Sequence, residues 1–367
     1  MTTTIWEEKQ VSSTIGNNIR LSVFGESHGE AIGCVIDGLP AGARIDMESV
    51  RLDMARRAPG KDRTATPRLE KDEPHILSGM LGDVTTGAPL AMIIENTNTR
   101  SGDYGNLLTV PRPSHSDYPA YVKYGGNNDI RGGGHFSGRL TAPLVFAGGI
   151  AKQILKEKGV FIGAHIKQIG RVQDDSFDYN NVTKEQIDSL THSSFSLLNP
   201  KKEEEMRAEV ECYRMEQNSV GGMIECAAIG LPVGVGGNMF DTVESRLSQI
   251  LFGIPAVKGV QFGLGFDFAS ANAGDVNDEY CIKDGKVALM SNNNGGVLGG
   301  MTDGAPVVLS VAIKPTPSIS KEQHSVNLTT MQDELLTIKG RHDPCIVPRA
   351  VPVVEAAVAF GLLDIMI

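Results

Sequence analysis

The sequence predicts an α+β fold with antiparallel sheets, formed as a single large domain from two duplicated halves. Residues 79–89 and 296–306 share a pattern in which a glycine-rich turn ends at Ala-Pro and an apolar run follows. Gly-Leu-Pro motifs at 38–42 and 230–234 precede them in the same order. Strands joined by short turns, without regular strand–helix–strand alternation, favour antiparallel sheets with helices packed between or against them. We therefore expect a pseudo-twofold relation between the halves and a cleft where they meet.

The first half is expected at residues 12–156, after an N-terminal tail at 1–11. Asp46 is the predicted N-cap of its first helix, which Pro59-Gly60 should end. The expected segments are strands at 18–24 and 31–37, a helix at 46–57, a mobile charged loop at 61–73, two strands across 76–96 with their turn at 85–87, a polar segment at 101–138 and a helix at 141–156. The polar segment is too long for an idle connection, which points to a functional role.

A middle insertion is expected at 157–219, because this part has no copy in the first half. The second half, 220–367, repeats the first and carries an extra segment at about 267–294. The expected elements are a strand at 160–169, surface helices at 184–190 and 200–217, and a final apolar helix at 353–366. The acidic run at 203–205 complements the positive end of the second surface helix's dipole.

Composition and charge argue against several classes of protein. The net charge of −10, without a long basic run, argues against a nucleic-acid partner. The most apolar stretch, 351–367, is interrupted by Pro352, Glu355 and Asp364, so no membrane-spanning segment is expected. The five cysteines lack C-x-x-C spacing and are expected as free thiols in a reducing compartment, which predicts a cytoplasmic protein. Metal-binding spacings such as His-Glu-x-x-His are absent, so no metal site is expected.

Histidines and arginines gather in polar or glycine-rich loops. These loops are 25–29 with His28, 112–118 with His115, 131–139 with Arg131, His135 and Arg139, and 339–345 with Arg341 and Asp343. Each has an ordinary alternative: a surface histidine, a flexible loop or a solvated charge run. The glycines at 132–134 lead into the predicted helix at 141, and a helix N-terminus can bind an anion. A fifth segment, 314–318, is a rigid, hydroxyl-rich turn that either holds a phosphate or ribityl chain or is only a turn.

Cations concentrated in the loops of an acidic protein predict a positive pocket for a multiply anionic small molecule. No activated Ser or Cys motif is present, which favours proton transfer or cofactor chemistry over acyl transfer.

Taken together, the motifs resemble those of bacterial-type chorismate synthases, in the same order. The motifs are at 25–29, 56–60, 112–118, 131–139, 256–259, 295–300, 314–318 and 340–345, and the resemblance runs from about residue 15 to the C-terminus. It implies conversion of 5-enolpyruvylshikimate 3-phosphate to chorismate and phosphate by a 1,4-anti-elimination, the last common step of the shikimate pathway. This reaction needs reduced FMN but has no net redox change. The resemblance also implies a homotetramer, with helices sandwiched between antiparallel sheets.

The resemblance implies roles for individual residues. His28 and His115 would be the acid–base groups, and Asp343 would relay a proton to or from the flavin. The implied FMN contacts are His135, Phe136, Ser137, Pro255, Ala256, Gly299, Lys314, Pro315, Thr316, Pro317, Ser318 and Arg341. Arginines expected to meet NADPH, as the source of reducing equivalents, or substrate anions are Arg57, Arg63, Arg131 and Arg139.

The chain departs from the common family pattern at a few positions. The family often has Arg-Ser-Ser-Ala-Arg where this chain has His-Phe-Ser-Gly-Arg at 135–139, and serine where this chain has Pro317. The tail at 1–11 and the insertion near 272–279 have no clear family counterpart. Two alternatives stay open at this point: a non-catalytic FMN- or phosphate-binding protein, and an enzyme that acts on another phosphorylated acid.

Overall fold

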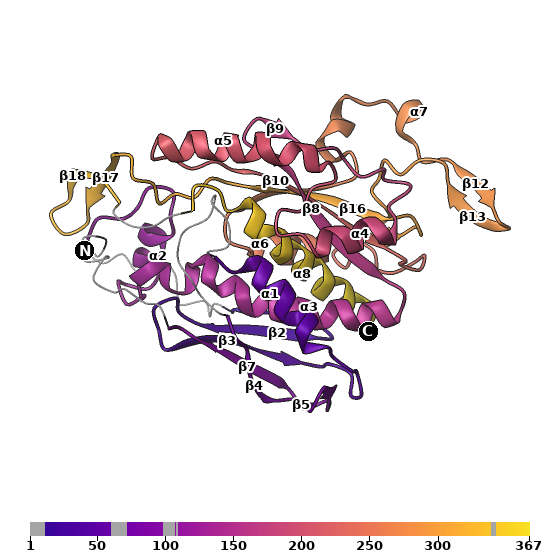
Figure 1. Ribbon diagram of the computed structural model, residues 1–367, viewed down its shortest axis with the longest axis horizontal. Coiled ribbons are helices and arrows are strands. Elements are labelled where there is room, and N and C mark those ends of the chain that lie inside the picture. Colours follow the sequence, from indigo (N-terminus) through magenta and orange to yellow (C-terminus); the bar gives the residue numbers. More distant parts are fainter. Residues whose placement is uncertain (1–11, 60–71, 98–106, 108, 339–342) are drawn as a thin grey trace.

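Two antiparallel sheets enclose a layer of helices in the computed structural model, which describes residues 12–59, 72–97, 107, 109–338 and 343–367 (Figure 1). The first sheet has the order β1 (Thr14–Ile15), β2 (Arg20–Gly25), β3 (Ala31–Asp37), β7 (Leu90–Glu95) and β4 (His75–Ser78). The second has the order β11 (Val257–Phe262), β16 (Val307–Ile313), β10 (Gly222–Ile229), β8 (Phe161–Ile169) and β9 (Val172–Gln173). The predicted α+β class with helices between antiparallel sheets is confirmed.

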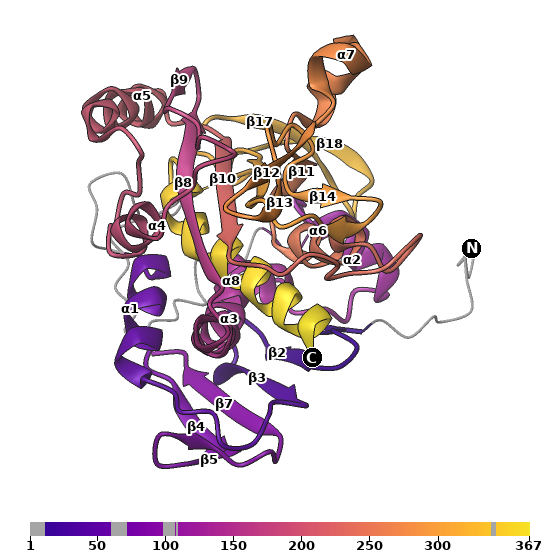
Figure 2. The same ribbon diagram turned by 90° about the vertical axis from the view of Figure 1, so that its right-hand side faces the viewer.

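The layer between the sheets contains α1 (Met47–Arg57), α3 (Thr141–Glu157), α6 (Val243–Gly253) and α8 (Val347–Met366) (Figure 2). Helix α3 packs on β2 and β3, α8 packs on β8 and β10, and the two helices pack on each other. Helix α8 is buried continuously from 351 to 364, because it is almost wholly apolar and packs against the second sheet and other helices, and its two buried carboxylates, Glu355 and Asp364, pair with cations.

Further helices and hairpins extend from this framework. The helices among them are α2 (Asp117–Lys123), α4 (Lys184–Thr191), α5 (Glu203–Met215) and α7 (Ala273–Val276). The hairpins are β5 (Met80–Leu81) with β6 (Val84–Thr85), β12 (Tyr280–Lys283) with β13 (Lys286–Leu289), β14 (Val297–Leu298) with β15 (Met301–Thr302), and β17 (Gln323–Asn327) with β18 (Gln332–Leu336). The β12–β13 hairpin and α7 project away from the body of the protein (Figure 1).

The two sheets have equivalent strand orders, and one side-chain hydrogen bond recurs beside each sheet. The order β2-β3-β7-β4 in one matches β8-β10-β16-β11 in the other. Thr85 Oγ1 donates to the Pro40 carbonyl at 2.7 Å, and Thr302 Oγ1 donates to the Pro232 carbonyl at 2.6 Å. Each member of the 79–89 and 296–306 pair thus contacts its own Gly-Leu-Pro motif in the same way. This agreement supports the interpretation of a duplication.

Some elements differ from the sequence predictions. An additional hairpin, β5–β6, lies within the segment where only two strands were expected. It could not be predicted because strands of two residues are too short to show an alternation of apolar and polar side chains. Strand β8, assigned from the sequence to the middle insertion, lies in the second sheet at the position equivalent to β2. Helix α8 begins at Val347 rather than at 353, because Pro348 lies in its first turn, where the missing N–H costs nothing, and Pro352 is accommodated inside the helix. The predicted cap of α1 is confirmed, since the Asp46 carboxylate accepts from the Glu48 N–H at 2.9 Å.

The described part of the chain contains no helix with the length and apolar character needed to cross a bilayer. The five cysteines are free thiols, and Cys34, Cys226 and Cys345 are buried.

The second sheet contains a buried histidine between two carboxylates. Nδ1 of His165 lies 3.0 Å from Asp174 and Nε2 lies 2.9 Å from Glu225, and Tyr179 donates to the same Glu225 carboxylate. Burial disfavours the imidazolium, but the hydrogen bonds to both carboxylates outweigh it and raise the pKa of His165. Both ring nitrogens thus face carboxylates in the interior, a setting that favours the charged form of His165.

This cluster predicts a pH dependence of stability. A pKa raised in the folded state means that the stabilisation is complete below the unfolded value of about 6.5 and is lost as the pH rises through the folded value. We expect the free energy of unfolding in urea to fall over that window, and the His165→Gln variant to lack this decrease. The exposed His192 provides the control variant His192→Gln. An unchanged pH dependence in His165→Gln would contradict this assignment.

Candidate active site

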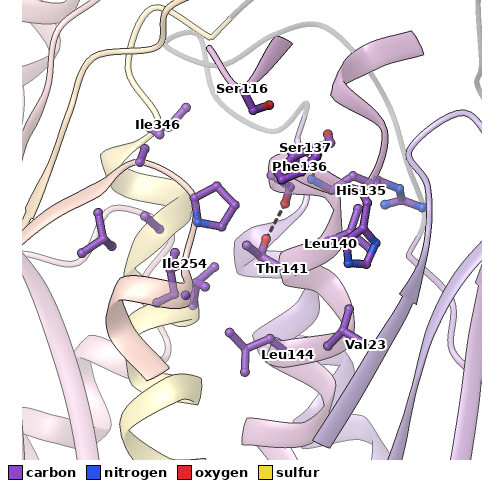
Figure 3. Close-up of a pocket in the computed structure, with 18 of the residues that line it drawn as sticks. Val23, Ser116, His135, Phe136, Ser137, Leu140, Thr141, Leu144, Ile254 and Ile346 are labelled. Carbon is purple, nitrogen blue, oxygen red and sulfur yellow. Dashed lines mark hydrogen bonds between the residues drawn. The ribbon is translucent and has the colours of Figure 1, made fainter. Parts of the chain in front are cut away.

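A cavity of about 990 Å³ opens where residues from both halves of the sequence meet. The expected site residues that line it are Arg57, His28, His115, His135, Phe136, Ser137, Arg139, Pro255, Ala256, Lys314, Thr316, Pro317, Ser318 and Asp343. Figure 3 shows its apolar part, with Leu144 and Val23 on one side and Ile254 on the other. The cavity therefore combines an apolar part with a set of polar and cationic groups.

His115 is oriented by a neighbouring carboxylate. Its Nδ1 lies 2.6 Å from Oδ1 of Asp117, which begins α2. Arg112 donates to both oxygens of Asp117, from Nε at 2.7 Å and from an Nη at 2.8 Å. Burial works against ionisation of Asp117, but the hydrogen bonds from Arg112 and His115 outweigh it and hold the pKa of this carboxyl below its usual value. An ionised Asp117 accepts the Nδ1–H of His115, which leaves Nε2 to exchange a proton at the cavity.

His28 packs against the triple glycine. The Ser27 hydroxyl donates to the Arg131 carbonyl at 3.1 Å, so His28 Nδ1, 3.2 Å from the same Ser27 oxygen, is the donor in that contact. Gly132 has φ +61°, and a Cβ there would lie 2.2 Å from Cε1 of His28. Gly133 has φ +94°, and a Cβ there would lie 3.4 Å from the His115 ring. Consecutive glycines thus bring one stretch of backbone against both histidines.

Substitution at this loop should therefore affect the site directly. In Gly132→Ala the new methyl group would collide with the His28 ring, and the left-handed backbone would be strained. We expect turnover to fall at least tenfold. Gly159→Ala is the matched control, because Gly159 has a similarly left-handed φ of +82° but open space around its Cβ position. Equal activity in the two variants would show that the contact with His28 is unimportant.

Other cations of the cavity are paired with carboxylates. Arg57 and Arg139 share the buried Asp72, and Arg349 of α8 pairs with Asp343. Arg349 also donates to the Arg57 carbonyl at 3.0 Å, which joins the start of α8 to the end of α1.

Lys258 and Lys314 differ from these cations, because neither pairs with a carboxylate among the described residues. Desolvation and the nearby charge of Lys258 lower the pKa of Lys314. Both lysines line the cavity, as does Thr316, whose buried Oγ1 has no hydrogen-bond partner within the described part of the chain. This side of the cavity therefore offers positive charge and a free hydroxyl to an anionic ligand.

His135 has partners at both ring nitrogens. Nδ1 lies 2.8 Å from the Gly25 carbonyl and donates to it, and Nε2 lies 2.7 Å from the Ser13 hydroxyl. With a partner at each nitrogen, the ring can offer only its face or edge to the cavity.

Some expected site residues lie elsewhere. Arg131 is half-exposed and does not line the cavity, because Asp129 captures its guanidinium at 2.8 Å. Gly299 lies in the β14–β15 turn, and neither Gly299 nor Pro315 is among the residues that line the cavity, although both neighbours of Pro315 are. Arg63 and Arg341 lie outside the described residues.

The structure adds functional candidates that the sequence did not single out: Asp72, Arg112, Asp117, Lys258 and Arg349. Asp117 had a signal, since it follows His115 by two residues. Asp72 had none, because its partners are distant in the sequence and only the fold brings them together.

Comparisons with known proteins agree on one family. The chorismate synthase family model matches residues 19–367. A chorismate synthase of Thermococcus kodakarensis is 45% identical over 349 residues, covering 95% of this chain and 96% of that protein. One of Methanobrevibacter smithii is 43% identical over 357 residues, covering 97% of each. A crystal structure of chorismate synthase is similar with a TM-score of 0.75 and 28% identity, covering 96% of this chain and 92% of that one.

Proposed function

The chain belongs to the chorismate synthase family, and we propose that the cavity between its two halves is the catalytic site. The enzyme is a lyase that converts 5-enolpyruvylshikimate 3-phosphate to chorismate and phosphate. The observation that carries the assignment of the site is the meeting of His28, His115 and several cations in one cavity. A protein that only binds FMN or phosphate would not need the His115–Asp117 pair, and nothing favours another phosphorylated acid as substrate.

The residues of the cavity fit reduced FMN. Thr316 offers a buried hydroxyl that has no hydrogen-bond partner among the described residues. Lys258 and Lys314 offer positive charge that no described carboxylate neutralises. A hydroxyl and positive charge of this kind suit the phosphate and ribityl chain of FMN. The apolar part around Leu144 and Ile254 suits a planar ring. When bound, reduced FMN supplies an electron reversibly to the substrate and regains it, so that no net redox change results.

The chain's own residues bind the substrate and move protons. The substrate has two carboxylates and a phosphate, which suit the arginines of the cavity. His115, held by Asp117 at Nδ1, takes up or gives up a proton at Nε2. His28 does the same at the other side of the triple glycine, and Asp343, held by Arg349, moves a proton at its carboxylate. The anti-elimination removes a proton and the phosphate from opposite faces of the ring, which requires acid–base groups at separate positions.

We further propose a cytoplasmic homotetramer that accepts NADPH as a source of reducing equivalents. Association is supported by the projecting β12–β13 hairpin, on which the cross-strand pair Ile282 and Val287 is 73% and 70% exposed. Exposed apolar pairs of this kind suit burial against another subunit.

A flavin titration tests the site. Reduced FMN is titrated anaerobically with and without the enolpyruvyl substrate, using wild type, Lys314→Ala and the surface control Lys321→Ala. Loss of one charge-assisted contact costs about 1.5–3 kcal/mol, so we expect Lys314→Ala to weaken flavin affinity about 10–100-fold. Lys321 pairs with Glu216 at the surface, and its variant should bind as wild type does. Equal affinity for reduced FMN in all three proteins would show that Lys314 does not contact the flavin.

A further inference from the structure

Two arginines that line the cavity share one buried carboxylate. Arg57 donates from an Nη to Oδ2 of Asp72 at 2.6 Å, and Arg139 pairs with Oδ1 of the same group. Asp72 is 4% exposed, Arg57 3% and Arg139 6%. Each carboxylate oxygen thus faces a different guanidinium, and the three side chains carry a net charge of +1.

Neutral groups hold the two guanidiniums from other sides. Nε of Arg57 donates to Thr141 Oγ1 at 3.1 Å, and its second Nη donates to the Gly138 carbonyl at 3.2 Å. Nε of Arg139 donates to Asn96 Oδ1 at 3.1 Å. The contacts connect the end of α1 and the start of α3, in the helix layer, with the residue that follows β7 of the first sheet. The guanidiniums are therefore fixed before any ligand arrives.

The negative charge of Asp72 offsets the repulsion between the two buried guanidiniums. Two buried guanidiniums without a counter-ion would repel each other and would each have lost their hydration. Burial disfavours ionisation of Asp72, but the charges of Arg57 and Arg139 outweigh it and lower the pKa of the carboxyl. Asp72 has a left-handed φ of +47°, a conformation that aspartate tolerates better than most residues.

We propose that Asp72 is a positioning residue that holds Arg57 and Arg139 together as a preformed binding unit for one anionic group of the substrate. Asp72 stays in place when the anion binds, because it is buried and does not line the cavity, whereas both arginines do. The anion then meets donors whose orientation is already set, so little side-chain entropy is lost on binding. This inference rests on the proposed function of the cavity.

Steady-state kinetics at saturating reduced FMN test the inference. We expect Asp72→Ala and Asp72→Asn to raise the KM for the enolpyruvyl substrate about 10–100-fold, as for the loss of a charge-assisted contact, with a smaller effect on kcat. Formate should restore the KM of Asp72→Ala, because a small carboxylate fits the space of the missing side chain, and should not restore that of Asp72→Asn. The control is Asp83→Asn, since Asp83 pairs with Arg44 on the exposed surface.

Two outcomes for the KM would overturn the inference. A lower KM in Asp72→Asn would show that Asp72 competes with the substrate for the arginines. An unchanged KM with a lower melting temperature would show a role in stability alone. If Asp72→Ala does not fold, the isosteric Asp72→Asn still gives the KM. Absence of turnover in wild type would count against the proposed function itself, whereas wild-type turnover with an unchanged KM in the variants counts against this inference only.

Discussion

Replacement of His115 with alanine should lower kcat by about 10²–10⁴-fold, the range usual for loss of a positioned acid–base group. The fold and the flavin affinity should persist, because Asp117 keeps both of its hydrogen bonds from the Arg112 guanidinium when the imidazole is removed. His115→Ala therefore tests the histidine more cleanly than a change at Asp117, which would leave Arg112 unpaired in a buried position. The measurement is single-turnover and steady-state formation of chorismate with saturating reduced FMN.

The matched control is His192→Ala, since His192 is an exposed histidine in the segment that follows α4. Wild-type turnover in both variants would show that His115 takes no part in proton transfer. His28→Ala should behave like His115→Ala if both histidines exchange protons with the substrate or the flavin.

Replacement of Glu355 with alanine should lower the free energy of unfolding by about 3 kcal/mol, the lower end of the range for breaking a buried ion pair. Glu355 of α8 is fully buried and lies 2.8 Å from Arg56 and 2.5 Å from Lys152. Burial disfavours its ionisation, but the two cations outweigh this and lower the pKa of Glu355 to about 2. Its removal leaves Asp53 as the one carboxylate of the described residues that pairs with both cations, and Arg56 also keeps its hydrogen bonds to Ser193, Leu190 and Ser196. We therefore expect the lower end of the range.

Urea denaturation of Glu355→Ala beside Glu211→Ala measures this effect. Glu211 pairs with Arg214 on the surface of α5, where solvent screens the interaction, so its loss should not change the midpoint measurably. Equal midpoints for the two variants would show that the buried cluster contributes no more than a surface pair.

The duplicated motifs predicted much of the architecture, because equal local sequence leads to equal turns and strand pairing. The two Gly-Leu-Pro turns accept hydrogen bonds from Thr85 and Thr302 in the same way, a detail that agrees with the duplicated motifs but was not predicted from them. Helix α8 was less predictable, since the helix was expected only at 353–366, whereas it begins at Val347 and continues through Pro352. The sequence predicted that strand β8 belongs to an insertion, because its residues do not resemble those of β2. Its place in the second sheet is nevertheless equivalent to that of β2 in the first.

Residues in motifs could be anticipated at the site, but the contacts between motifs could not. His28, His115 and Asp343 lie in polar loops that stand out along the chain, and all three line the cavity. Asp72 and Arg349 lie outside such motifs, and they acquire significance only through partners that the fold brings close. Arg131 shows the opposite case: it stands in a motif, but its guanidinium pairs with Asp129 and it does not line the cavity.

The most direct test of the account is an anaerobic assay with chemically reduced FMN, 5-enolpyruvylshikimate 3-phosphate and no NADPH. Chorismate and phosphate are measured together with the absorbance of the flavin. We expect equal amounts of the two products over many turnovers, with the flavin still reduced at the end and no product when only oxidised FMN is present. Phosphate release without flavin, or oxidation of flavin in proportion to product, would contradict the account.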